Sequence, residues 1–135
     1  MLGWLDEALA DAQSACAAQP HSGVYLALRG CLRMRLGQPF DAALDFSAAA
    51  PLLREAGAPV SEAIFNRGIC HKLQGNDSEA IKDFETVLAQ APACHAVKTA
   101  LGCIHMSRKR YKDALDLFQV VAAFSGWSAA AANNV

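Results

Sequence analysis

The sequence predicts an all-α fold of stacked antiparallel helix pairs, and three observations lead to this prediction. Alanine accounts for 28 of the 135 residues, and aromatic residues make up only 7% of the chain. Alanine has the strongest helix propensity, and a scarcity of β-branched and aromatic residues disfavours a sheet. The third observation is that glycine, alanine and phenylalanine recur at a fixed interval. Together these features favour one domain of closely packed helices.

The recurring interval is 34 residues. It separates Gly68 from Gly102, Ala80 from Ala114, and Phe84 from Phe118. Upstream, Gly30, Ala42 and Phe46 stand 38 residues before Gly68, Ala80 and Phe84. A period of this length is typical of repeated helix pairs. In each pair we expect the glycine of the first helix to let the second approach closely. The alanine and the phenylalanine, four residues apart, then share one face of the second helix.

Breaker residues divide the chain into seven expected helices. Pro20 ends the first, Gly37 and Gly75 stand where helix C-caps belong, and Pro92 precedes the sixth. Asp41, Ser61, and Asp77 or Ser78 are the expected N-caps of the third, fourth and fifth helices. The helices are expected at 4–18, 22–36, 39–55, 61–74, 77–90, 94–107 and 110–124.

These landmarks resemble the tetratricopeptide repeat (TPR) family. The 34-residue period, the glycine, the Ala-x-x-x-Phe pattern and the closing Pro92 all match that family's repeat. The resemblance implies a right-handed superhelix, or solenoid, of stacked helix pairs, with residues 1–135 forming a single repeat domain. The expected divisions are a half repeat at 1–22, repeats at 23–60, 61–94 and 95–128, and a tail at 129–135.

Two features depart from the family pattern. Arg33, His71 and His105 stand where the first helices usually carry an aromatic residue. The repeat at 23–60 also holds a four-residue insert, near Ala49 to Val60. Four residues are about one helical turn, so the insert either lengthens a helix or makes the turn at 57–59 bulge outward. It is either a tolerated loop insertion or part of a partner-recognition surface.

The sequence contains no pattern typical of an enzyme, so we expect no catalysis, no cofactor and no metal. The glycines never form a nucleotide-binding loop, and no nucleophile elbow or zinc-protease helix is present. The pairs Cys70-His71 and Cys94-His95 are adjacent in sequence. Neighbouring residues on a helix diverge by about 100°, so such a pair does not face one ion or one substrate.

The charge balance argues against a nucleic-acid partner. The chain has 12 Lys and Arg against 13 Asp and Glu, a net charge of -1, whereas nucleic-acid binders carry a basic surplus. The one basic cluster is Arg108-Lys109-Arg110-Tyr111-Lys112. It is either a solvated turn or a contact for an acidic partner or a phosphate.

Cysteine usage and hydropathy bear on the compartment. The five cysteines are odd in number and scattered, which indicates free thiols in a reducing compartment such as the cytoplasm. No apolar stretch is long enough to span a membrane, which needs about 18 residues.

The resemblance also implies a concave groove lined by the first helix of each pair. The groove residues expected to bind a peptide are Leu28, Cys31, Met34, Arg35, Phe65, Asn66, Ile69, Lys72, Leu73, Cys103 and Met106. The other inward-facing positions are Val24, Ala27, Glu62, Ala96, Thr99, Ala100 and Ser107. This set is largely apolar, and an exposed apolar surface of that size is typical of a partner-binding site.

We therefore expect a non-enzymatic protein–protein interaction scaffold that binds a peptide or an amphipathic helix. The alternative is a self-association segment, or a regulatory array of a larger protein, whose groove is filled by its own terminus or by a second copy. A TPR subgroup grips the C-terminal carboxylates of chaperones with five basic and amide side chains. The matching positions here are Ala27, Cys31, Asn66, Ala96 and Ala100. One match in five argues against such a clamp.

Overall fold

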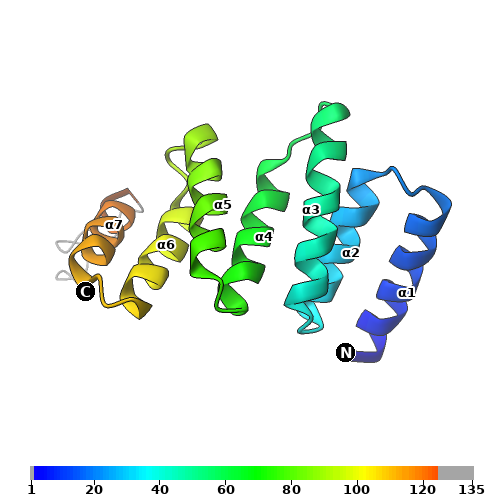
Figure 1. Ribbon diagram of the computed structural model, residues 1–135, viewed down its shortest axis with the longest axis horizontal. Helices are drawn as coiled ribbons and strands as arrows, with labels where there is room; N and C mark the ends of the chain where they lie inside the picture. Colours follow the sequence, from blue (N-terminus) through cyan, green and yellow to red (C-terminus); the bar gives the residue numbers. More distant parts are fainter. Residues whose placement is uncertain (1, 125–135) are drawn as a thin grey trace. The chain divides into compact units, whose positions relative to one another are not determined.

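The computed structural model describes residues 2–124, and within that range the chain folds into seven α-helices and no strand (Figure 1). The helices are α1 (Leu2–Ala18), α2 (Gly23–Arg35), α3 (Pro39–Glu55), α4 (Ser61–Leu73), α5 (Asp77–Gln90), α6 (His95–Ser107) and α7 (Tyr111–Phe124). The predicted all-α fold is confirmed, and no predicted helix end is displaced by more than two residues. The predicted tail at 129–135 lies outside the described residues.

The chain divides into two compact units, Met1–Thr86 and Val87–Val135, which are described separately. Unit 1 holds α1 to α4 and most of α5, and unit 2 holds the end of α5 with α6 and α7. The division falls inside α5.

Unit 1 is a stack in which each helix packs on its neighbour in the chain. α1 packs on α2, α2 on α3 and α3 on α4, and successive helices run antiparallel (Figure 1). The largest fully buried side chains of this unit are Phe46, Phe84, Ile64 and Cys70. A Cβ added to Gly30 would lie 2.9 Å from the ring of Phe46, and one added to Gly68 would lie 2.7 Å from that of Phe84. The expected close approach at these glycines is confirmed.

Unit 2 repeats this contact between α6 and α7, which pack against each other. A Cβ on Gly102 would lie 2.6 Å from the ring of Phe118. Val97 and Ile104 on α6 and Ala114 on α7 are buried. The glycine–phenylalanine contact therefore recurs in all three helix pairs that the sequence period defines.

The turns within these pairs share one geometry. Gly37, Gly75 and Lys109 all have positive φ, at 75°, 80° and 61°. In each turn the next residue's amide donates to a carbonyl five residues back, at 2.8 Å in all three cases. This is the left-handed helix end that favours glycine. The predicted C-caps at Gly37 and Gly75 are therefore confirmed.

The N-cap predictions were wrong for the third and fourth helices. α3 is preceded by Gln38, with Pro39 at its first position, and α4 is preceded by Val60. Asp41 and Ser61 lie inside the first turns instead. Proline is well suited to the first helical position, and an acid in the first turn still favours the helix dipole.

The insert lengthens both a helix and a connection. α3 has 17 residues where α5 has 14. Five residues join α3 to α4, and four join α5 to α6. Three inserted residues thus extend α3 and one extends the loop that follows.

Two of the three positions that lack the family's aromatic residue, Arg33 and His71, lie beside a buried carboxylate. Arg29 and Arg33 both donate to the buried Asp45, at 2.7 and 2.9 Å. In the next pair Arg67 donates to Asp83 at 2.7 Å, and His71 Nε2 lies 3.9 Å from the same carboxylate. In unit 1, a buried carboxylate bound by arginine therefore stands beside the positions that lack the aromatic residue.

Candidate functional site

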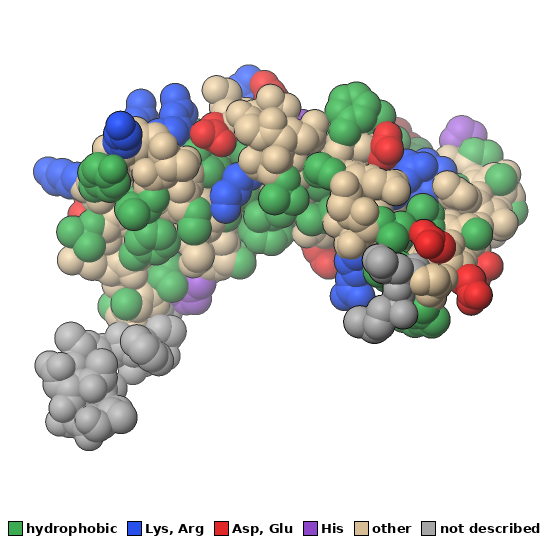
Figure 2. All heavy atoms as spheres, turned by 90° about the horizontal axis from the view of Figure 1, so that it is seen from below, with side chains coloured by type: hydrophobic (Ala, Val, Ile, Leu, Met, Phe, Trp, Pro, Cys, Tyr) green, Lys and Arg blue, Asp and Glu red, His purple; other side chains and the backbone are tan. Residues whose placement is uncertain are grey.

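Several large apolar side chains stay exposed after folding. They include Val24, Leu28, Phe40, Leu44, Leu73 and Met106. Figure 2 shows apolar side chains interspersed with polar ones across one face of the molecule. A contiguous group of such side chains beside a hollow is the usual sign of a binding site, whereas scattered ones are ordinary.

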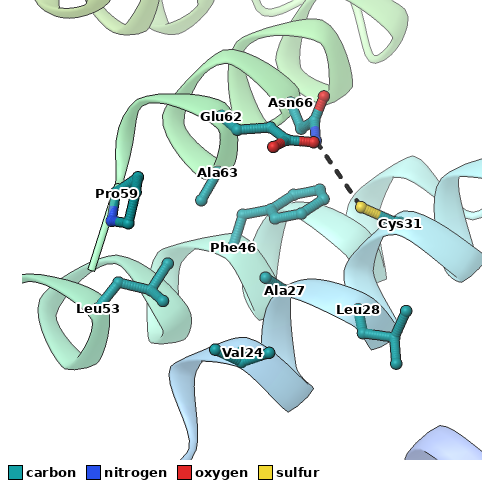
Figure 3. A pocket seen from close by; sticks show the side chains of 10 residues that line it. All are labelled: Val24, Ala27, Leu28, Cys31, Phe46, Leu53, Pro59, Glu62, Ala63 and Asn66. Carbon is teal, nitrogen blue, oxygen red and sulfur yellow. Dashed lines mark hydrogen bonds between the residues drawn. The ribbon is translucent and has the colours of Figure 1, made fainter. Parts of the chain in front are cut away.

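Such a group lies in unit 1, where α2, α3 and α4 enclose a hollow of about 180 Å³ (Figure 3). We call it the insert pocket. Its lining residues are Val24, Ala27, Leu28, Cys31, Phe46, Leu53, Pro59, Glu62, Ala63 and Asn66.

α2 supplies one wall through two aliphatic side chains four residues apart. Val24 is 62% exposed and Leu28 is 49% exposed, and this spacing places both on one helical face. The start of α2 is fixed by Ser22, whose hydroxyl accepts a hydrogen bond from the amide of Tyr25 at 3.3 Å. The two side chains therefore stand on a capped helix, not on a loop.

The extended end of α3 and the loop after it supply the opposite wall. Leu53 and Pro59 both belong to the segment lengthened by the insert. Leu53 is buried, and a Cβ on Gly23 would lie 2.9 Å from its Cγ. Phe46, which is almost wholly buried, faces the hollow from beneath (Figure 3). The insert thus builds a wall that the shorter helix α5 does not extend far enough to provide.

Three polar groups border the pocket. Glu62 is exposed, and the amide of Asn66 donates to the Cys31 sulfur at 3.8 Å (Figure 3). Burial raises the pKa of Cys31, the Glu62 charge raises it further, and Arg35 lowers it. A nearby buried thiol, Cys70, has its pKa raised to about 11 by burial. Raised thiol pKa values leave little thiolate at neutral pH, so neither sulfur is an activated nucleophile.

The pocket brings together six of the positions predicted to face inward. They are Val24, Ala27, Leu28, Cys31, Glu62 and Asn66. Sequence reasoning missed Phe46, Leu53, Pro59 and Ala63. Phe46 had been recognised only as a core anchor. Leu53 and Pro59 lie within the insert region, which is the sequence feature from which they could have been found.

The other predicted groove residues lie outside this pocket. In unit 1, Met34, Ile69 and Lys72 are half-buried, and Arg35 and Leu73 are exposed. Phe65 is half-buried, with its ring centroid 5.7 Å from that of Phe84, so part of its surface belongs to the contact between α4 and α5. In unit 2, Cys103 and Met106 are exposed on α6.

Metal sites and membrane spans are two further features that bear on function. Across residues 2–124, no three His, Cys, Asp or Glu side chains are grouped so that they could hold a metal ion. None of the helices formed by those residues is long and apolar enough to cross a membrane.

Comparison with known proteins agrees with the repeat pattern. Residues 61–94 match the family model described as tetratricopeptide repeat. Human "Tetratricopeptide repeat protein 6" is 28% identical over 104 residues, which cover 74% of this chain and 19% of that protein. The chain therefore spans about a fifth of this curated relative.

Solved structures show the same fold. The chain matches a structure titled "Crystal structure of MamA protein" with a TM-score of 0.78 and 14% identity, covering 90% of this chain and 64% of that one. At this identity the similarity concerns the fold alone. Tetratricopeptide repeats generally mediate protein–protein interactions. Residues 61–94 therefore match a tetratricopeptide repeat, and the glycine–phenylalanine contact of this repeat recurs in the helix pairs before and after it.

Proposed function

We propose that this chain is a non-enzymatic protein–protein interaction scaffold whose insert pocket binds a large apolar side chain of a peptide or an amphipathic helix. One observation carries the proposal. Val24 and Leu28 leave about half or more of their surface in water beside a 180 Å³ hollow. Covering apolar surface of this kind is the main favourable term in protein association.

The size and the rim of the pocket define the ligand's chemistry. A cavity of about 150 Å³ accepts a benzene ring, so a hollow of about 180 Å³ suits one leucine, methionine or phenylalanine side chain. Glu62 at the rim favours a lysine or arginine next to that anchor. The amide of Asn66 both donates and accepts, so it suits the backbone of an extended peptide.

The pocket lacks the chemistry of a carboxylate clamp or of an enzyme. Ala27 and Cys31, two of the clamp positions, are half-buried and uncharged. The raised pKa values of Cys31 and Cys70 support binding over covalent catalysis. The five cysteines are all free thiols, which supports the further proposal that the chain works in a reducing compartment such as the cytoplasm.

The test is a peptide-display selection on the wild-type chain, followed by affinity measurement on variants. The pocket variant is Val24→Asp/Leu28→Asp, because both side chains are exposed and their replacement spares the core. Selected peptides should carry one large apolar residue beside a lysine or arginine. Their affinity for the pocket variant should fall about tenfold or more, the usual loss when a central apolar contact is removed.

The matched control is Phe40→Asp/Leu44→Asp. It also puts two carboxylates in place of exposed apolar side chains of unit 1, but at positions that do not line the pocket. The control should bind the peptides as the wild type does, with unchanged helical circular dichroism in both variants. Equal weakening by both variants, or peptides without an apolar residue, would contradict the proposal. Replacing Phe65 is a poorer test because Phe65 also packs on Phe84.

Light scattering addresses the second copy as an occupant. A wild-type chain that dimerises, together with a pocket variant that stays monomeric, would assign the pocket to self-association and overturn its assignment to a peptide. A monomer at every concentration agrees with the proposal.

A further inference from the structure

The basic residues of unit 2 are concentrated in one turn. Residues 87–135 carry 5 Lys and Arg against 2 Asp and Glu, while residues 1–86 carry 7 against 11. Four of the five cations of unit 2 are exposed at this turn: Arg108, Lys109 and Arg110 lie between α6 and α7, and Lys112 lies in the first turn of α7. Lys and Arg side chains gather over this part of the surface, at the left of Figure 2.

This basic turn has the same backbone as its two uncharged counterparts. The amide of Lys109 donates to the carbonyl of Met106 at 3.1 Å, and the amide of Arg110 donates to that of His105 at 2.8 Å. The turn at Gly37 shows the same two bonds, at 3.1 and 2.8 Å. The turn at Gly75 shows them too, at 3.0 and 2.8 Å. Only the side chains differ.

Those side chains oppose the stability of the turn in two ways. Lys109 holds a left-handed conformation, with φ 61°, where the other two turns have glycine, and a side chain disfavours that conformation. Arg110 and Lys112 flank the start of α7, where the helix dipole favours acids and disfavours cations. α5 instead begins with Asp77.

No compensating contact offsets this cost inside the described chain. Within residues 2–124, none of the four cations forms an ion pair with an Asp or Glu, whereas Arg29, Arg33 and Arg67 of unit 1 all do. A locally strained backbone that carries charge without an ion-pair partner points to an external ligand.

From this we propose that the α6–α7 turn is a second interaction site, which binds a short acidic segment of a protein partner. The site lies outside the insert pocket and does not depend on it. A run of aspartates or glutamates would pair with the exposed cations in charge-assisted hydrogen bonds.

The extent of the patch favours a peptide over a nucleic acid. Asp113 and Asp116 are exposed on α7 directly after the turn, so the positive surface does not continue along the helix. Nucleic-acid surfaces follow the backbone with a longer basic stripe. A patch confined to one turn therefore suits a short acidic peptide.

The test measures binding of a fluorescent oligoglutamate peptide to the whole chain at low salt by anisotropy. The turn variant is Arg108→Gln/Lys109→Gln/Arg110→Gln. It keeps a side chain at the left-handed position, so its fold should match the wild type. The matched control is Arg54→Gln/Lys82→Gln/Lys98→Gln, which lowers the net charge by the same amount elsewhere.

We expect the turn variant to bind the peptide about tenfold more weakly, since each exposed pair is worth roughly 0.2 to 1 kcal/mol. The control should change the affinity less than about twofold, and physiological salt should weaken wild-type binding. No binding of oligoglutamate, equal loss in both variants, or turn-dependent binding of oligothymidylate but not of oligoglutamate would each overturn the proposal. The display peptides selected for the insert pocket should bind the turn variant normally, which separates the two sites.

Discussion

In the α4–α5 pair, Arg67 holds the buried Asp83 through two bonds, Nη2 to Oδ1 at 2.7 Å and Nε to Oδ2 at 2.9 Å. Thirty-four residues later, in the α6–α7 pair, the same two positions are Leu101 and Leu117. The glycine–phenylalanine contact is retained in both pairs. Both pairs therefore share the close approach of the two helices at the glycine. The adjacent positions hold an ion pair in α4–α5 and two leucines in α6–α7.

The ion pair also reaches the preceding helix. Arg67 Nη1 donates to the hydroxyl of Ser47 on α3 at 3.3 Å, a contact that leucine is unable to make. The hydrogen bond to Asp83 raises the pKa of Arg67, which keeps the guanidinium charged at every accessible pH. Arg67 and Asp83 depend on each other, because either one alone would leave a buried charge unpaired.

Breaking the Arg67–Asp83 ion pair should have the largest effect on stability. Asp83→Leu leaves the partly buried guanidinium of Arg67 without its carboxylate and should lower the free energy of unfolding by about 3 kcal/mol. The double variant Arg67→Leu/Asp83→Leu copies unit 2 and should regain most of that loss. Urea unfolding followed by circular dichroism measures both. If the double variant is as unstable as the single one, the two pairs are not interchangeable.

The converse change tests unit 2. Leu117→Asp places a carboxylate at the position that matches Asp83, while the position that matches Arg67 is the buried Leu101 and carries no charge. It should destabilise the α6–α7 pair by about 2 to 3 kcal/mol. This is near the low end of the cost of burying a group without a partner, because Leu117 is only half-buried. Hydrogen exchange localises the loss to α6 and α7. Loss of protection in α2 and α3 instead would contradict this assignment.

The glycine contact should also differ between the two pairs. Gly68→Ala drives a methyl group to 2.7 Å from the fully buried ring of Phe84 and should cost about 2 to 3 kcal/mol. Gly102→Ala meets the half-buried ring of Phe118, which has room to shift, and should cost about 1 kcal/mol. Thermal unfolding of the two variants compares them. Equal losses would show that ring burial does not set the penalty.

The sequence predicted the helices well because their signals are local. The period, the Ala-x-x-x-Phe pattern and the glycines at 37 and 75 located every helix to within two residues. The N-caps at Asp41 and Ser61 were mispredicted because two residue types that suit a cap also suit the first turn.

The site was less predictable because its walls come from several helices. The groove positions on α2 and α4 were named from the family's inward face, and six of them line the insert pocket. Leu53 and Pro59 were not predicted to line a site, because the spacing does not show whether an insert lengthens a helix or makes the following loop bulge. The Arg67–Asp83 pair has a counterpart 38 residues earlier, Arg29–Asp45, but spacing alone does not show that side chains 16 residues apart meet.

A thiol distinguishes the same two pairs at high pH. Cys70 on α4 corresponds to Ile104 on α6, and both are fully buried. Burial raises the pKa of Cys70 from 9.0 to about 11, so the unfolded chain loses this proton at lower pH than the folded chain. Stability from this group is complete below about pH 9 and should fall by up to about 2 kcal/mol between pH 9 and 11. Cys70→Ala should flatten that part of the pH profile relative to the wild type, and parallel profiles would contradict the prediction.

Exchanging the residues at the turns of the two helix pairs, Gly75 and Lys109, should have the smallest effect on stability. Lys109→Gly relieves the left-handed strain at φ 61° but adds freedom to the unfolded chain, so it should stabilise unit 2 by only about 0.5 to 1 kcal/mol. Gly75→Lys puts a side chain at φ 80° and should destabilise unit 1 by about 1 kcal/mol. Melting temperatures of both variants measure these changes.

Because Lys109→Gly removes one of the four cations, it should also weaken binding of the oligoglutamate peptide by about two- to threefold. A variant that is both more stable and weaker in binding is the result expected if the lysine is kept for its charge. A gain in stability with unchanged binding would leave the strain at Lys109 without that explanation.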